Sequence, residues 1–186
     1  MQKPQAGFTI VELLIVIVVI ATLAAISIVA YNGIRTKAEN DRTVSVVGDY
    51  VKAFKLYQSD NGYLPESNTS TNIYRCLGEF YATGCGGQGT PGCGFGNINN
   101  SASFNNLLRQ YMSNTSNLPM PSTASYQCPE APLYGAIYVY RGGSGFADLY
   151  YFLQGDNACV NIAGVAAAKS SYTTGITRCS MRVYDN

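Results

Sequence analysis

A single uninterrupted apolar run constrains this chain more than any other feature. Residues 8–30 read FTIVELLIVIVVIATLAAISIVA and contain one charged side chain, Glu12, and neither glycine nor proline. As an α-helix this run extends about 34 Å, which is enough to cross the ~30 Å hydrocarbon core of a bilayer. It therefore predicts a membrane-spanning helix. The alternative is a buried helix of a soluble protein, but a chain of 186 residues rarely needs a helix that is apolar on every face.

The run differs from a conventional secretory signal peptide. Such a signal has an apolar stretch of only ~7–15 residues, and small residues at the cleavage site follow that stretch. Here the notable small residue, Gly7, precedes the run. More Lys and Arg side chains follow the run than precede it, which by itself places the C-terminal part in the cytoplasm. The six cysteines favour the opposite side, an oxidising compartment, and we give them more weight.

Composition excludes several classes of function. The chain has no histidine, which removes the commonest general base and the Ser-His-Asp triad. Twelve basic side chains against 11 acidic ones argue against a general nucleic-acid-binding protein, because such proteins need a clustered basic excess. Six cysteines without histidine favour three disulfides over zinc ligands. We therefore expect no enzymatic activity, no cofactor, no metal site and no specific nucleic-acid partner.

Glu12 is the most informative single residue. A carboxylate inside an apolar helix costs roughly 2.5–3.5 kcal/mol on membrane insertion unless it is paired. If the chain were cut after Gly7, the new amine of Phe8 would lie about one helical turn from Glu12. In an assembly of packed helices, the amine of one subunit then pairs with the carboxylate of its neighbour. The alternative is that Glu12 reaches the headgroups and caps the amino-terminal end of the helix dipole.

These residues resemble the signature of a known family. The segment GFTIVELL, which contains Gly7, Phe8 and Glu12, is similar to the G-F-T-x-x-E-L-L motif of type IV pilins and pseudopilins. The resemblance covers residues 1–60 closely and the remainder only in general layout. It implies cleavage between Gly7 and Phe8 by a prepilin peptidase, followed by N-methylation of Phe8. It also implies that Glu12 neutralises the amine of an adjacent subunit during assembly.

The resemblance carries an implied function, location and set of partners. It implies a structural subunit of a type IV pilus filament, a major or a minor pilin, that supports adhesion, motility or DNA uptake. The partners would be other pilin subunits, the prepilin peptidase and the membrane platform of the pilus machine. Before assembly the chain would cross the cytoplasmic membrane once, with its C-terminal domain outside. The alternatives are a pseudopilin of a type II secretion or competence machine and a membrane-anchored adhesin that never polymerises.

The helix is predicted to continue beyond the membrane. Residues 34–59 contain no proline, and Val44, Val47, Val51 and Phe54 repeat at the spacing of one helical face. The polar run Ser-Asp-Asn-Gly that ends at Gly62 predicts the end of the helix. We therefore expect one long helix, the second half of which packs on a globular domain.

The last third of the chain carries the signals of an antiparallel sheet. Residues 136–141 and 147–153 are rich in β-branched and aromatic side chains around a Gly-Gly-Ser-Gly turn, which predicts a hairpin. Residues 176–184 predict a third strand with odd-numbered side chains facing the helix, and residues 158–162 a short fourth strand. The predicted fold class is α+β, a long N-terminal helix packed on a small antiparallel sheet, which is also the fold that the resemblance implies.

Between helix and sheet, residues 66–132 are rich in Ser, Thr, Asn, Gly and Pro and predict a long loop. Within this loop, Ser103 is expected to cap one short helix. Its glycine-rich part follows no predicted strand, so we interpret it as a surface loop rather than a nucleotide site. The predicted division is a leader at 1–7, a membrane and assembly helix at 8–30, an amphipathic half of the helix at 31–60, a loop with a short helix at 61–134, and a sheet with a disulfide-bounded C-terminal region at 135–186.

The cysteines are predicted to form three disulfides. Cys159 and Cys179 bracket the C-terminal segment, apart from the other four, and we expect them to pair. The other four allow three connectivities, among which the sequence does not decide: Cys76, Cys85, Cys93 and Cys128. We favour Cys85–Cys93 together with Cys76–Cys128. A metal site built from these four thiolates is a weaker alternative, because C-x-x-C pairs are absent.

Overall fold

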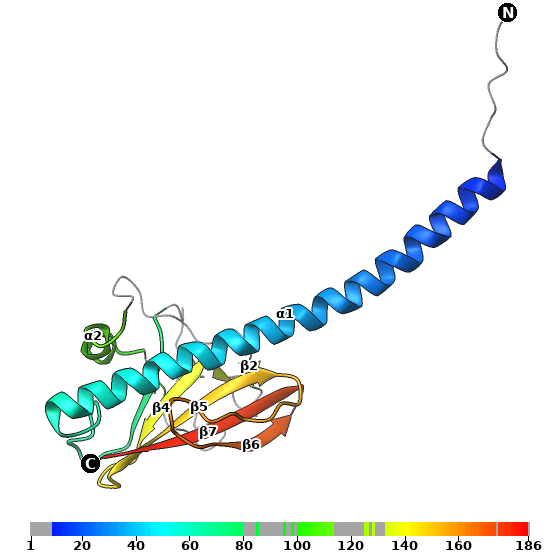
Figure 1. Cartoon of the computed structure of the whole chain (residues 1–186). Helices are drawn as coiled ribbons and strands as arrows, with labels where there is room; N and C mark the ends of the chain where they lie inside the picture. Colours follow the sequence, from blue (N-terminus) through cyan, green and yellow to red (C-terminus); the bar gives the residue numbers. More distant parts are fainter. Residues whose placement is uncertain are drawn as a thin grey trace, which may run out of the picture. The chain divides into compact units, whose positions relative to one another are not determined.

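The computed structural model describes residues 9–79, 85, 95, 98, 100–113, 125–126, 128, 133–173 and 175–185. The chain divides into two compact units, residues 1–38 and residues 39–186. In chain order the elements are α1 (Ile10–Asn61), β1 (Ile73–Cys76), α2 (Ala102–Arg109), β2 (Ser125–Tyr126), β3 (Leu133–Tyr134), β4 (Ala136–Tyr140), β5 (Phe146–Gln154), β6 (Ala167–Thr173) and β7 (Ile176–Tyr184) (Figure 1).

Helix α1 belongs to both units and ends where the sequence predicts. It runs without a break from Ile10 to Asn61. The next residue, Gly62, has a φ of 82°, a left-handed conformation that glycine adopts at little cost. Its N–H donates to the carbonyl of Gln58 at 2.8 Å, so the last turn is closed by a backbone bond.

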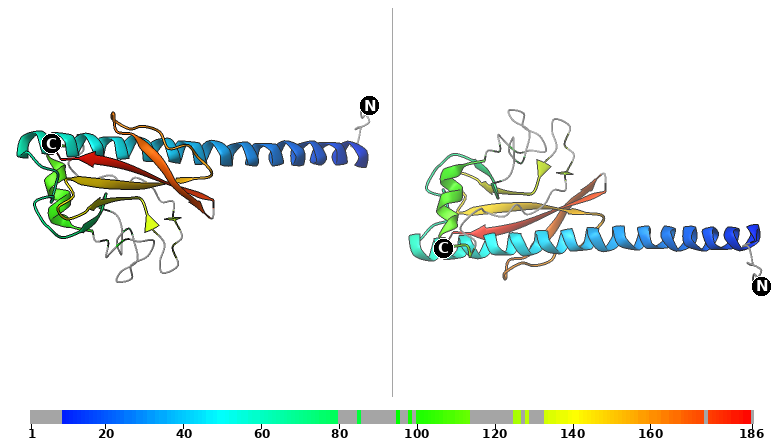
Figure 2. Two further views of the ribbon diagram at one scale, coloured as in Figure 1. Left: turned by 90° about the horizontal axis from the view of Figure 1, so that it is seen from below. Right: turned by 90° about the horizontal axis from the view of Figure 1, so that it is seen from above.

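The second unit contains the antiparallel sheet. Within the described residues its five strands have the order β1-β4-β5-β7-β6, and β2 pairs separately with β3. The predicted hairpin is β4–β5, and the predicted third strand, β7, pairs with β5 so that Cys179 lies opposite Tyr151. Figure 2 shows the second half of α1 lying along one face of this sheet. The observed fold is therefore α+β, as predicted.

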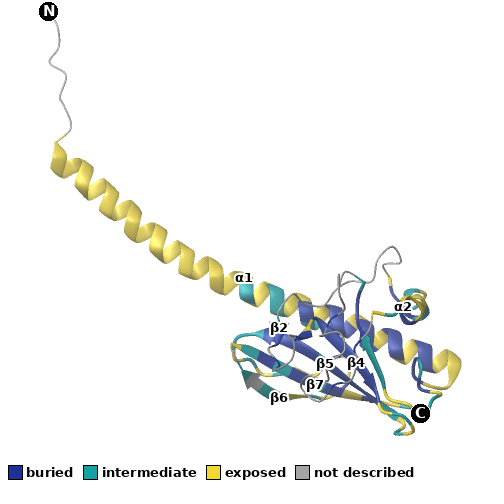
Figure 3. Ribbon diagram, turned by 180° about the vertical axis from the view of Figure 1, so that it is seen from behind, coloured by how far each residue is buried: buried dark blue, intermediate teal, exposed yellow. Residues whose placement is uncertain are grey.

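One face of the sheet and one face of α1 form the main core of the second unit. Val47, Val51 and Phe54 of α1 are fully buried there, in the positions that the helical spacing predicts. Figure 3 shows these turns of α1 and the central strands as buried. The Tyr138 ring centroid lies 5.2 Å from that of Phe54 and 5.1 Å from that of Phe104 on α2, so three elements meet at one aromatic contact.

The opposite face of the sheet is also covered, in part by residues of the long loop. Phe95, Ile98 and Tyr126 are buried there against the strands. As a result every residue of β4 is buried, on both faces of the sheet. A strand covered on both sides lacks the alternation of polar and apolar residues, which explains the continuous apolar sequence of β4.

Three local predictions are wrong. The fourth strand of the predicted sheet is β6 rather than residues 158–162, where a tight turn closes with two bonds between Ile162 and Val165 at 2.9 and 3.0 Å. Strand β1 lies in the region predicted to be loop, and Ser101, not Ser103, caps α2 through the N–H of Phe104. Strand β2 also lies in the predicted loop and pairs with β3 outside the five-stranded sheet. Strands β1 and β6 lie at the edges of that sheet, and β6 is rich in small and polar residues, as edge strands often are.

Two disulfides join described cysteines. Cys159 is bonded to Cys179, the pairing expected from the sequence. Cys76 is bonded to Cys85, so the expected pairs Cys76–Cys128 and Cys85–Cys93 are wrong. Cys76 is the last residue of β1, and Cys85 follows it by nine residues in the sequence. The N–H of Cys85 also donates to Cys76 Sγ, so Cys85 lies directly beside Cys76. Cys128 is disulfide-bonded, and Cys93 lies outside the described residues.

Two buried tyrosines of the main core differ in their hydroxyl groups. Tyr138 Oη donates to the carbonyl of Pro65 at 2.6 Å. Tyr151 Oη is buried and has no hydrogen-bond partner within the described part of the chain. Burial raises the pKa of Tyr151 to about 12 and that of Tyr138 well above its ordinary value, so both rings stay neutral at physiological pH. The two positions form a matched pair for a stability test.

We expect Tyr138→Phe to destabilise the protein by about 1–3 kcal/mol, because the carbonyl of Pro65 loses its buried donor. Tyr151→Phe should be neutral or stabilising by up to about 1 kcal/mol, because it removes a buried hydroxyl that has no partner among the described residues. Chemical unfolding of the detergent-solubilised chain, followed by near-ultraviolet circular dichroism, measures both. Equal losses in the two variants would contradict this assignment.

Removal of the Cys159–Cys179 bond should also lower the free energy of unfolding. The bond closes a loop of 20 residues, which in the chain-entropy model stabilises the folded state by about 3 kcal/mol. The double substitution Cys159→Ala/Cys179→Ala avoids an unpaired thiol and should lower the free energy of unfolding by about that amount. A loss below about 1 kcal/mol would show that the bond contributes little.

Candidate functional site

The candidate site lies at the amino-terminal end of α1. Gly7 and Phe8, the predicted cleavage and methylation positions, lie outside the described residues, so both stay predictions. The first described residue is Thr9, one position before α1 begins. Between Thr9 and Ile34 the sequence holds one charged side chain, Glu12. The geometry around Glu12 therefore decides what this end of the helix is able to do.

Thr9 and Glu12 hold each other in a reciprocal cap. The N–H and the hydroxyl of Thr9 both donate to Glu12 Oε2 at 2.8 Å. In return the N–H of Glu12 donates to Thr9 Oγ1 at 3.2 Å. Such a capping box supplies partners for amide groups that the first helical turn leaves unpaired, and the carboxylate faces the positive end of the helix dipole. In the single chain, Glu12 thus caps the helix, which is the alternative role considered from the sequence.

The cap uses one of the two carboxylate oxygens. Both bonds from Thr9 end on Glu12 Oε2, and Oε1 accepts no hydrogen bond within the described residues. Glu12 is also exposed. Because capping and pairing use different oxygens, Oε1 can receive a donor from another molecule while Thr9 keeps the carboxylate in place. The capping role and an intermolecular role are therefore compatible.

The surface around Glu12 is unusually apolar. Every large apolar side chain from Ile10 to Ile34 is exposed, with exposed fractions between 49% and 80%. An exposed apolar surface of this extent marks a region covered by lipid or by other protein in its working environment. By length and composition α1 is able to cross a membrane, since its most apolar window has a mean hydropathy of 3.1.

The other polar side chains of this apolar surface are satisfied within the helix. Thr22 donates its hydroxyl to the carbonyl of Val19 at 2.9 Å, and Ser27 donates to that of Leu23 at 2.8 Å. Such bonds let hydroxyl groups lie in an apolar environment without a further partner. Between Ile10 and residue 30, the carboxylate of Glu12 is thus the polar group with an open acceptor.

The reciprocal cap was not predicted, although its signal is in the sequence. Thr9 and Glu12 have the spacing of the capping box, a Ser or Thr followed three residues later by Glu or Gln. Both residues also belong to the longer GFTIVELL motif, which does not by itself indicate a cap. The free Oε1 has no sequence signal, because it follows from the orientation of the side chain.

The cysteines and acids of the second unit suggest no further chemical site. The described residues hold no group of three or more Cys, Asp and Glu side chains arranged to bind a metal. An ion pair with two bonds, at 2.7 and 3.1 Å, joins Asp148 to Arg182 and braces neighbouring strands. We therefore regard the start of α1 as the candidate functional site.

Comparisons with known proteins point to the same region. A family profile described as the prokaryotic N-terminal methylation motif matches residues 2–28. The chain is 34% identical over 73 residues to fimbrial protein EcpC of Eikenella corrodens, a match that covers 39% of this chain and 48% of that protein. It is 33% identical over 73 residues to the type IV major pilin protein PilE1 of Neisseria gonorrhoeae, covering 39% and 44%.

A secretion protein is similar to the same extent. The chain is 34% identical over 64 residues to the type II secretion system core protein G of Escherichia coli, covering 34% of this chain and 44% of that protein. Each match thus spans less than half of the relative. No solved structure is significantly similar to the chain. In its methylation motif, its long N-terminal helix and these partial matches, the N-terminal part of the chain is similar to type IV pilins and to a type II secretion protein.

Proposed function

We propose that the chain is a structural subunit of a type IV pilus filament, a major or a minor pilin, and that it assembles through the apolar part of α1. The observation that carries this proposal is the exposed apolar segment of α1, from Ile10 to Ile34, with a single carboxylate, that of Glu12, whose Oε1 is open among the described residues. In a filament, the exposed side chains of many copies would cover one another. Two of the relatives are named fimbrial protein and major pilin, which supports this proposal.

Assembly would proceed in two steps. A prepilin peptidase cuts between Gly7 and Phe8, and the new amine of Phe8, which carries the N-methyl group, lies at the start of the helix. When a subunit enters the growing bundle at the membrane platform of the pilus machine, its Phe8 amine meets Oε1 of Glu12 on a neighbour. The pair forms in a medium of low dielectric constant, where opposite charges attract more strongly than in water.

The location follows from the same proposal. Before assembly the apolar segment would lie in the cytoplasmic membrane and the second unit, with its disulfides, outside it, because oxidising compartments preserve such bonds. After assembly the subunit would be part of a fibre at the cell surface. From there it would support adhesion, motility or DNA uptake.

A second candidate is a pseudopilin of a type II secretion or competence machine, in which a short assembly replaces a long fibre. The similarity to the type II secretion system core protein G favours it. The two candidates share the same assembly site at Glu12. Electron microscopy of wild-type and deletion strains separates them, since only a pilus subunit gives long surface fibres that the deletion removes.

The charge of Glu12 and its cap can be tested separately. Glu12→Gln keeps a side chain able to cap the helix but removes the charge, so it should enter the membrane normally and reduce the yield of sheared fibres by at least about tenfold. Thr9→Val removes the hydroxyl cap but keeps the carboxylate, and it should still assemble. Fibre yield is measured relative to the membrane-inserted protein. Wild-type yield from Glu12→Gln would refute the proposed pairing.

Processing can be tested by the mass of the amino-terminal peptide of purified protein. We expect the protein to begin at Phe8 with one N-methyl group, because the proposed pairing needs the amine that cleavage creates. Gly7→Leu should leave the leader attached and abolish assembly, since a leader on residue 8 replaces that amine by an amide. Protein that begins at Met1 and still forms fibres would contradict the proposal.

A further inference from the structure

Asp60 is an acidic residue in an unfavourable position. It is the penultimate residue of α1, and the last turn of this helix holds no basic side chain. The C-terminal end of a helix carries a partial negative charge, so a carboxylate there is repelled. Asp60 is exposed and forms no ion pair or side-chain hydrogen bond within the described part of the chain. Among the described residues of the single subunit, nothing compensates its charge.

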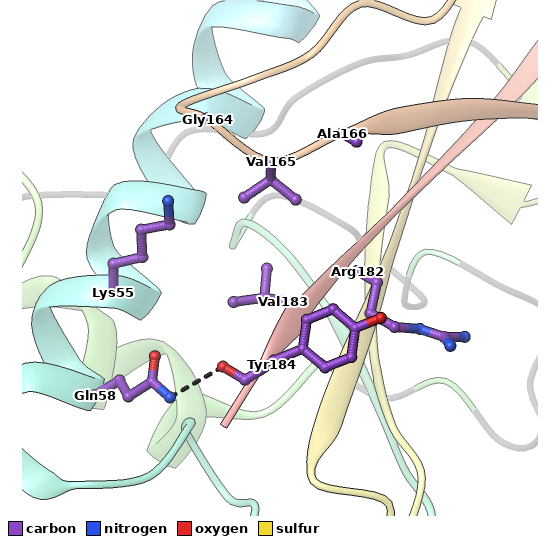
Figure 4. A pocket seen from close by; sticks show the side chains of 8 residues that line it. All are labelled: Lys55, Gln58, Gly164, Val165, Ala166, Arg182, Val183 and Tyr184. Atoms are coloured by element: carbon purple, nitrogen blue, oxygen red, sulfur yellow. Dashed lines mark hydrogen bonds between the residues drawn. The ribbon is translucent and has the colours of Figure 1, made fainter. Parts of the chain in front are cut away.

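A pocket beside Lys55, about one turn before Asp60 on α1, is lined by positive charge. This pocket of about 570 Å³ lies between α1, the turn at Gly164 and the end of β7 (Figure 4). Its eight lining residues include two cations and no acid: Lys55, Gln58, Gly164, Val165, Ala166, Arg182, Val183 and Tyr184. Arg182 is paired with Asp148, so Lys55 is the lining cation without a carboxylate partner among the described residues. The lining therefore favours an anionic group.

Lys55 has hydrogen-bonding capacity to spare. Its ammonium donates to the carbonyl of Ala163 at 2.8 Å, and Figure 4 shows its side chain directed along the pocket toward Gly164. An ammonium has three N–H donors, so two remain for a ligand. Lys55 is exposed and has no carboxylate partner within the described residues. It is thus able to bind a carboxylate without losing its bond to Ala163.

The spacing of Lys55 and Asp60 suits a contact between two copies rather than within one. Five residues of α-helix turn through about 140° beyond one full turn and advance about 7.5 Å, so the two side chains point to nearly opposite sides of α1. A head-to-tail interface between identical subunits needs complementary groups on different faces of the same subunit. Lys55 and Asp60 meet this condition.

We propose that the pocket at Lys55 receives the Asp60 carboxylate of a second copy of this chain. The inference rests on the proposed function, because it takes its neighbour from filament assembly. The contact would lie in the second unit of each subunit, outside the membrane. It would join Lys55, with two free donors, to an acid that the end of its own helix repels.

A charge exchange tests the pairing. Lys55→Asp and Asp60→Lys should each lower fibre yield about tenfold, because each places two like charges opposite each other. The combined Lys55→Asp/Asp60→Lys variant restores opposite charges and should recover to within about threefold of wild type. Lys52→Asp makes the same charge change at an exposed lysine outside the pocket and should leave the yield unchanged. Normal yields from both single variants would overturn the inference.

Cross-linking keeps the inference testable if Lys55→Asp disturbs the turn at Ala163. A Lys55→Cys/Asp60→Cys variant should give a ladder of disulfide-linked multimers from fibres on a non-reducing gel. Lys55→Cys/Asp41→Cys is the matched control and should give no ladder. Asp41 is an exposed acid of the second unit without an ion-pair partner among the described residues, and it lies about 21 Å from Lys55 along α1. Fibres that need Glu12 but give no Lys55–Asp60 ladder would overturn this contact and leave the proposed function unaffected. Absence of fibres from the wild-type protein would instead reject the proposed filament.

Discussion

The proposed assembly depends on one electrostatic constraint, the presence of a single carboxylate, that of Glu12, in the exposed apolar segment of α1 from Ile10 to Ile34. In hydrocarbon an ionised acid is stable only when it is paired or fully hydrogen-bonded. Thr9 supplies part of what Glu12 needs, through two bonds to Oε2, but leaves Oε1 open among the described residues. Thr22 and Ser27 show the contrast, because their hydroxyls find acceptors in their own helix. In the proposed filament, a neighbour supplies this missing donor.

Helix α1 has a different surface in each of the two units. In the first unit the apolar side chains of α1 surround the helix and are all exposed, which suits lipid or other helices. In the second unit only one face is apolar, and it packs on a sheet through Val47, Val51 and Phe54. The faces left over carry charges, among them Lys55 and Asp60. The same change of pattern therefore separates an exposed apolar helix from a folded domain.

Sequence reasoning succeeded where a regular pattern was long. The apolar run and the helical spacing predict α1 through to Asn61, and aromatic strands around a glycine turn predict β4 and β5. It failed for β1 and β6, since edge strands need little apolar sequence. No sequence pattern indicates the partner of Cys76 either, because the pairing depends on which cysteine the folded chain brings next to the end of β1. At the site, the Thr9–Glu12 cap was readable from spacing, whereas the open Oε1 was visible only in the structure.

The most direct test of the central claim is a measurement between two copies in assembled fibres. Fibres grown from an equal mixture of ¹⁵N-phenylalanine-labelled and ¹³C-glutamate-labelled protein allow solid-state NMR to detect contacts that only different copies can make. The account predicts dephasing of the Phe8 amine nitrogen by the Glu12 carboxyl carbon, at a separation of about 4 Å, typical of an ion pair. Intact fibres in which the Phe8 amine shows no such dephasing would contradict it.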